Sequence, residues 1–238
     1  MYNVYLTDNT DLIGGIEFII PESSLSSRTI VKNIIAIDCK INWPLHYLFS
    51  PQVIENFNKM FRFLLRVKKA QMDVSSVWMD INHISDIKLR ILAIEIRNQL
   101  LALIGNLQNY CFTDVIANEC NLLMFQVEKS DTYTELQTAL TEFQSKVMRQ
   151  LFLMTDKIST FFITIFDLCE IFSKLIHKSS SSYIDTSLTM FKANLEKTIE
   201  SMFNFLEKFE TCVESPDVRN LLTNLDTNRY FRNKYCTS

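Results

Sequence analysis

The sequence contains little glycine and proline, with three and four residues respectively among 238. After Pro51, only Gly105 and Pro216 remain. Because both residue types interrupt helices, their scarcity predicts long helices. A phosphate-binding loop is also hard to build from so few glycines, and neither the G-x-x-x-x-G-K-[ST] nor the G-x-G-x-x-G motif occurs. The sequence therefore argues against nucleotide hydrolysis.

Clustered metal ligands and paired thiols are lacking as well. The six cysteines are widely spaced without a C-x-x-C pair, which is typical of reduced thiols in a core. His46, His83 and His177 do not form a two-ligand helical motif, and Asp80 three residues before His83 is the nearest pattern. A capping or surface role is favoured over metal binding. We expect no cofactor and no enzymatic activity, and an enzyme with a cofactor pocket between helices is the weakest alternative.

The charge balance excludes two classes of partner. The net charge of −3 and the pI near 5.7 provide no global basic field, so nucleic acid is not an expected partner. The longest run without charge, residues 98–113, is too short to cross a bilayer and contains several amides, so no membrane partner is expected. No secretory signal pattern is found, and a cytosolic compartment fits best. With 47% hydrophobic residues and 18 Phe, the chain should bury an aromatic core.

The pattern predicts a mainly α fold, a bundle of long helices with a small two-stranded β ribbon near the N-terminus. Residues 14–21 and 29–41 are rich in β-branched residues and are the two predicted strands. Residues 1–42 would form the ribbon and entry segment, packed on a helical body over 43–238. The serine-rich stretch at 178–184 is predicted to be a mobile linker between helices.

Four long helices and one short helix are predicted in the body. Ser50 and Pro51 form a helix start, Asp131 followed by Glu135 resembles another, and Ser215 followed by Pro216 starts the last helix. Gly105 is expected to let another backbone approach closely. The predicted helices cover 51–79, 85–127, 132–177, a repeat over 188–213, and a short segment ending at Leu222.

The first of these helices has two distinct faces. Four basic residues lie within about a quarter turn, opposite the expected apolar side, and no acidic residue falls between 56 and 72. The stripe is either a solvated face, with Lys59 pairing with Glu55 and Lys69 with Asp73, or a docking surface for an acidic protein. The basic stripe comprises Lys59, Arg62, Arg66 and Lys69, and the apolar side comprises Val53, Phe57, Met60, Phe61, Leu64, Gln71 and Trp78.

Residues 37–78, IDCKINWPLHYLFSPQVIENFNKMFRFLLRVKKAQMDVSSVW, resemble the strand, W-P-L turn and long helix of the C-terminal GRIP domain in gamma-tubulin complex components. The turn PLHYLFSP is most similar to that of the smaller, fourth component. Three later blocks agree in order, and the resemblance covers about 35–231. These blocks are LQNYCFTDVI, TELQTALTEFQSKV and VRNLLTNLDTNRYF.

The resemblance implies a helical module that binds gamma-tubulin, works with other gamma-tubulin complex components and contributes to microtubule nucleation. It also implies a location in the cytoplasm, at the cytoskeleton and a microtubule organizing centre such as a centrosome or spindle pole. The family has further helices upstream, so the chain is expected to be a fragment, a truncated member or a short isoform. Glu142 stands where members often carry a histidine.

Two sets of residues follow from the resemblance. The alternative to gamma-tubulin binding is a generic helical scaffold or tethering subunit, which packs against other proteins without binding gamma-tubulin. The expected gamma-tubulin contacts are Asn56, Lys59, Arg62, Arg66, Lys69 and Gln71, and the expected structural corner is Trp43, Pro44, Leu45 and Phe49.

Overall fold

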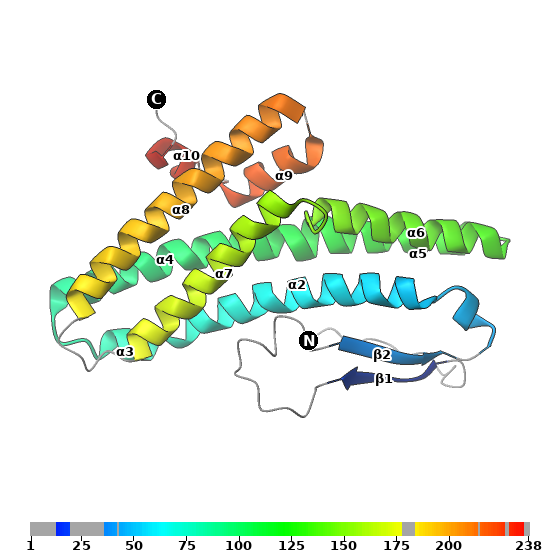
Figure 1. Cartoon of the computed structure of the whole chain (residues 1–238), viewed down its shortest axis with the longest axis horizontal. Helices are drawn as coiled ribbons and strands as arrows, with labels where there is room; N and C mark the ends of the chain where they lie inside the picture. Colours follow the sequence, from blue (N-terminus) through cyan, green and yellow to red (C-terminus); the bar gives the residue numbers. More distant parts are fainter. Residues whose placement is uncertain are drawn as a thin grey trace. The chain divides into compact units, whose positions relative to one another are not determined.

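The computed structural model describes a mainly helical chain over residues 13–19, 36–41, 43–177, 184–213, 215–226 and 229–235. The described residues group into two compact units. The first holds those within Met1–Arg66 and Ala117–Leu151, and the second those within Val67–Ile116 and Phe152–Ser238. The helix α2 (Pro51–Ser76) contributes residues to both units. Figure 1 labels the elements.

The structure corrects the predicted β ribbon, because the two strands among the described residues are short and their pairing is partly irregular. The strands β1 (Ile13–Ile19) and β2 (Ala36–Ile41) pair antiparallel (Figure 1), but the register is irregular between Ile13 and Ile16. Two consecutive glycines lie at that point, and glycine commonly marks such irregularities because it has no side chain to pack. Regular pairing therefore covers only four residues of each strand. The rest of both predicted strands, 20–21 and 29–35, lies outside the described residues.

The chain enters α2 as its sequence predicted. A short 3-10 helix η1 (Leu45–Tyr47) precedes the helix, and the Val53 backbone N–H donates to the Ser50 hydroxyl over 3.4 Å. Pro51 is the first helical residue, where its missing N–H costs nothing. This start is confirmed.

The other helices follow the predicted order with shorter segments. The start of α6 lies close to the predicted one, but the capping residue is Thr132 rather than Asp131, and the Glu135 side chain accepts from the Thr132 backbone N–H. The segments are α3 (Trp78–Asn82), α4 (Ile87–Asn109), the π-helix η2 (Tyr110–Ala117), α5 (Asn118–Lys129), α6 (Tyr133–Gln150), α7 (Asp156–His177), α8 (Ile184–Val213), α9 (Pro216–Leu225) and α10 (Tyr230–Tyr235). Residues 178–183 of the predicted linker lie outside the described residues.

The single helix predicted over 132–177 is wrong. The chain breaks between α6 and α7, and Phe152 takes a positive φ of 55° with its side chain 4% exposed. A non-glycine residue in this conformation is strained and needs tertiary packing to hold it. The break coincides with the passage from the first unit to the second. No glycine or proline marks it, so a search for helix breakers misses it.

The prediction for Gly105 is also wrong. A side-chain carbon added there would meet nothing within 4 Å, so no other backbone in the described segments approaches this glycine closely. The predicted second helix instead contains a different irregularity, the π-helical turn η2, which interrupts the regular α-helical bonding between α4 and α5.

The second unit contains a deep apolar core. The apolar repeat predicted over 188–213 is confirmed along most of α8, since Leu188, Leu195, Ile199 and Leu206 are fully buried. Phe209, near the end of the helix, is only partly buried. The helix α8 packs against α4, α7, α9 and α10 (Figure 1). None of the helices among the described residues is long and apolar enough to cross a membrane.

Candidate partner-binding surface

The buried face of α2 differs from the predicted one. Of the residues predicted to lie on the apolar side, Met60 is the one that is buried. Trp78 lies beyond the end of α2, with 43% of its side chain exposed. At 100° per residue, the observed face is rotated by about a quarter turn. The basic stripe therefore lies beside the buried face rather than opposite it, which explains the partial burial of Arg62, Arg66 and Lys69. The buried residues are Asn58, Met60, Phe63, Val67, Ala70 and Val74.

Small side chains explain the rotation. The predicted face was chosen from the large residues Phe57, Phe61 and Leu64, all of which are only partly buried. Val67, Ala70 and Val74 are 2% exposed or less. Close packing between helices favours such small residues, and their positions carry no distinct signal in the sequence.

Asn56 has a structural environment that the sequence did not reveal. Its amide donates to Gln144 Oε1 in α6 over 3.2 Å and accepts from Gln52 Nε2 over 3.1 Å. Gln144, which is 3% exposed, also donates to the Val53 backbone carbonyl over 2.9 Å. Asn56 thus joins α2 to α6 within the first unit.

The cations of the stripe have unequal access to a partner. Lys59 is exposed, whereas Arg62 pairs with Glu55 over 3.2 Å. Glu55 therefore pairs with Arg62, two turns away, instead of with Lys59 as expected. The expected pair between Lys69 and Asp73 is present at 2.6 Å. Exposed pairs of this kind contribute little to stability.

The predicted contact residues are divided between the two units. Asn56, Lys59, Arg62 and Arg66 belong to the first unit, and Lys69 and Gln71 belong to the second. Gln71 Oε1 accepts from Lys68 Nζ over 2.8 Å. The two groups therefore need to be tested separately.

The predicted corner has two kinds of residue. Leu45 and Phe49 are partly buried, which is compatible with a role in fixing the turn. Pro44 is exposed, and Trp43 is 75% exposed, so the indole ring does not hold the turn by burial. Trp43 instead offers an aromatic surface to solvent.

An apolar surface on α5 was missed by the sequence analysis. Leu122, Met124, Phe125 and Val127 are 41% to 60% exposed, and Tyr133 at the start of α6 is 47% exposed. At 100° per residue, Leu122 and Phe125 lie on one side of the helix, and Met124 and Val127 lie on another. Exposed apolar groups of this kind often mark interaction sites. The alternation of α5 between apolar and polar residues is weak, so only the structure distinguishes its solvent side from its packed side.

Histidines and cysteines do not assemble a reactive site among the residues that the structure describes. His177 Nδ1 lies 2.6 Å from Asp80 Oδ2, and His83 Nδ1 lies 2.7 Å from the Met79 carbonyl, so Asp80 pairs with His177 rather than His83. No group of three metal-ligating side chains occurs in the described segments. Burial raises the pKa of the Cys111 thiol to about 12, which disfavours the nucleophilic thiolate.

The cysteines are not uniformly the core thiols that were expected. Cys111 and Cys169 are buried, Cys120 is partly buried, and Cys212 is exposed. Burial also raises the pKa of Cys169 and of Cys120. Of these four cysteines, Cys111 and Cys169 therefore fit the prediction.

Comparison with known proteins identifies a matching family. A family model described as gamma tubulin complex component C-terminal matches residues 2–231. The resemblance predicted from the sequence is confirmed over a longer stretch than expected.

Several curated relatives agree with this match. Gamma-tubulin complex component 4 of Homo sapiens is 25% identical over 203 residues, covering 83% of this chain and 30% of that protein. The Medicago truncatula homolog of that component is 26% identical over 220 residues, with coverage of 83% and 30%. Spindle pole body component 98 of Dictyostelium discoideum is 27% identical over 209 residues, with coverage of 81% and 24%. The chain spans less than a third of the length of these relatives.

Proposed function

Because the chain belongs to the gamma-tubulin complex component family, matching its C-terminal region, we propose that it binds gamma-tubulin and contributes to microtubule nucleation. The family match over nearly the whole chain is the observation that carries this proposal. The proposed partners are gamma-tubulin and other gamma-tubulin complex components. The proposed location is the cytoplasm, at the cytoskeleton and a microtubule organizing centre, and the proposed role includes no catalysis.

The solvent side of α2 in the first unit is the proposed contact. Lys59 is its most accessible cation, and Arg62 and Arg66 lie on the same side of the helix. A local basic surface can attract an acidic partner even though the whole chain is acidic. Asn56 would act indirectly, because its amide is engaged by Gln144.

Lys59→Glu tests this surface with a matched control. Lys68 is also exposed on α2, nine residues later and so about half a turn around the helix. Lys68→Glu changes the net charge equally on a different side. We expect Lys59→Glu to weaken binding to purified gamma-tubulin by about three- to tenfold in a sedimentation assay, with the loss diminished at high salt.

Two results would contradict the proposal. Equal binding by the Lys59→Glu and Lys68→Glu variants would remove the stripe from the contact. An absence of binding by the unmodified chain would show that this region does not bind gamma-tubulin on its own. Lys69→Glu, measured separately, tests whether the part of the stripe in the second unit contributes.

A scaffold role is the second candidate, and the apolar surface on α5 favours it. Leu122 and Phe125, which lie on one side of α5, would pack against another protein without involving the basic stripe. Phe125→Ser should then abolish capture of another gamma-tubulin complex component while leaving gamma-tubulin sedimentation unchanged. If Phe125→Ser and unmodified chains capture that component equally, the scaffold role of this surface is excluded.

A further inference from the structure

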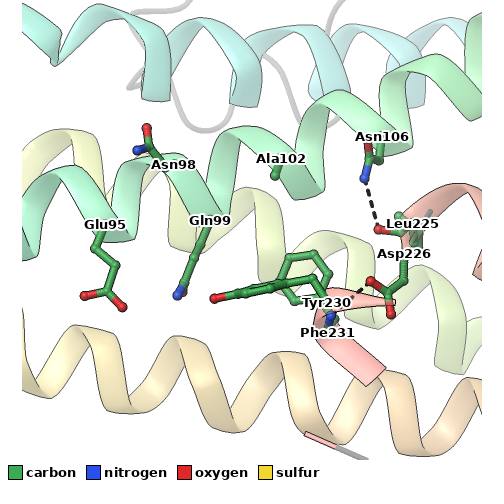
Figure 2. Close-up of a pocket in the computed structure, with 9 residues that line it drawn as sticks. All are labelled: Glu95, Asn98, Gln99, Ala102, Asn106, Leu225, Asp226, Tyr230 and Phe231. Atoms are coloured by element: carbon green, nitrogen blue, oxygen red, sulfur yellow. Dashed lines mark hydrogen bonds between the residues drawn. The ribbon is translucent and has the colours of Figure 1, made fainter. Parts of the chain in front are cut away.

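A cavity of about 560 Å³ lies in the second unit, and none of its lining residues belongs to the basic stripe. One wall is α4, and the other is the corner where α9 ends and α10 begins (Figure 2). The corner is firmly built, because the Leu225 carbonyl accepts from Asn106 Nδ2 over 3.1 Å and the Asp226 carboxylate accepts from the Phe231 backbone N–H over 2.9 Å. These contacts make a preformed wall.

Gln99 supplies the unusual feature of this cavity. Its side chain is 6% exposed, and both Oε1 and Nε2 are buried without a hydrogen-bond partner among the described residues. Figure 2 shows the amide pointing from α4 toward Tyr230. Buried amide atoms are nearly always paired, because each unpaired atom loses its hydrogen bonds to water without replacement. The Nε2 group therefore has no acceptor for its N–H bonds among the described residues, and Oε1 has no donor.

Both carboxylates that line the cavity, those of Glu95 and Asp226, are already engaged. Glu95 Oε2 lies 2.8 Å from Lys192 Nζ, so its charge is compensated. Asn106 and Asp226 hold the corner, as described above. The unmet requirement is thus that of a neutral amide rather than of a charge.

Aromatic rings border the same space. Phe231 is 3% exposed and stacks on Phe203 with ring centroids 5.4 Å apart, which fixes its position. Tyr230 is 48% exposed, and Figure 2 shows its hydroxyl directed toward the Gln99 amide. Because solvent does not reach the amide, a ligand would require rotation of the Tyr230 side chain, whose ring could then cover a planar group.

We propose that this cavity binds a planar, uncharged carboxamide, whose carbonyl accepts from Gln99 Nε2 and whose N–H donates to Gln99 Oε1. A primary amide is the smallest group that presents this donor and acceptor side by side. The carboxamide comes either from a glutamine side chain of a partner protein or from a free small molecule. The site is independent of gamma-tubulin binding by α2.

The test uses the full 238-residue chain and two probes. Benzamide represents a free carboxamide, and an acetylated Ala-Gln-Ala peptide N-methylamide, whose one primary carboxamide is in the glutamine residue, represents a glutamine side chain. Binding is followed by NMR through the side-chain NH₂ resonances of Gln99. We expect at least one probe to shift these resonances, with a dissociation constant on the order of 1 mM for so small a ligand.

Gln99→Met removes the amide and retains the volume of the side chain. Gln108→Met is the matched control, because Gln108 lies on the same helix, also has a buried Oε1 without a partner among the described residues, and does not line the cavity. We expect Gln99→Met to weaken probe binding by about tenfold and Gln108→Met to leave it unchanged. A thermal melt confirms that both variants fold, and resonances of the cavity residues report binding in the Gln99→Met variant.

The outcomes separate the alternatives. A response to benzamide alone assigns the site to a free small molecule, and a response to the peptide assigns it to a glutamine side chain. No response to either probe, or equal binding by the Gln99→Met variant, overturns the proposal and leaves water as the partner of the amide. None of these outcomes depends on gamma-tubulin.

Discussion

The two compact units of this chain differ in what holds their elements together. In the first unit, side-chain amides join distant elements: Asn58 bonds both backbone groups of Ile37, and Gln150 donates to the buried carboxylate of Glu119 over 3.0 Å. In the second unit, large apolar side chains such as Phe172 and Phe203 are fully buried. The first unit also bears the exposed apolar residues of α5. We therefore expect truncations of fully buried rings in the second unit to cost more stability than single truncations in the first unit.

Phe172→Ala should have the largest effect and tests the core of the second unit. Its ring is 0% exposed and lies 5.6 Å from the ring of Phe191, so truncation leaves a cavity and should cost about 3–5 kcal/mol of unfolding free energy. Phe57→Ala, in the first unit, should cost clearly less because that ring is only partly buried. Urea unfolding measures the unfolding free energy of both variants. Equal losses would contradict the expectation that the core of the second unit contributes more to stability.

Asn58→Ala tests the amide contacts of the first unit. Asn58 is 5% exposed, accepts from the Ile37 backbone N–H over 2.7 Å, and donates to the Ile37 carbonyl over 3.1 Å. Loss of both bonds should cost about 1–3 kcal/mol, because the Ile37 backbone loses its partner. Hydrogen exchange at the Ile37 amide should accelerate, while exchange at Phe172 in the second unit stays slow. Unchanged exchange at Ile37 would show that this contact does not hold the strand.

Stability at alkaline pH distinguishes the units through their thiols. The folded pKa of Cys111, raised by burial to about 12, exceeds the value of about 8.5 expected in the unfolded chain. The unfolded state therefore loses its proton first, and the stability present below pH 8.5 declines as the pH rises toward 12. One such thiol gives a slope of about 1.4 kcal/mol per pH unit.

Cys111→Ala should reduce this slope, as measured by urea unfolding at several values between pH 8 and 10. Cys120→Ala, in the first unit, should reduce it less, because the Cys120 thiol is only partly buried. Burial and the charges of Cys111, Asp217 and Asp114 also raise the pKa of Tyr110, which adds to the slope at higher pH. An unchanged slope in the Cys111→Ala variant would contradict this account.

Phe125→Ser should have the smallest effect on stability. The ring is 55% exposed, so the unfolding free energy should change by about 0.5 kcal/mol or less. Lys129, whose ammonium lies 4.0 Å from the ring centroid, keeps its solvation in the variant. A loss of more than about 1 kcal/mol would show that this surface supports the fold of the first unit rather than serving a partner.

Much of the fold was predictable because helix starts depend on neighbouring residues. Ser50 and Pro51 begin α2 as predicted, and Glu135 takes part in the start of α6, where Thr132 rather than the predicted Asp131 is the capping residue. The break at Phe152 was not predictable, because a strained residue without a glycine is held by packing from elsewhere in the chain. Of the candidate site, the basic residues were found, but their unequal access and the role of Asn56 were not.

The sequence by itself determined the helical character, the order of the helices, the buried stripe of α8 and the resemblance to a family. These features depend on composition, on spacing within one or two turns, or on contiguous motifs. The tertiary structure decided which face of α2 is buried, how Asp80 pairs with His177, and that the Gln99 amide faces a cavity without a partner among the described residues. Each of these depends on side chains that are far apart in the chain and meet only after folding.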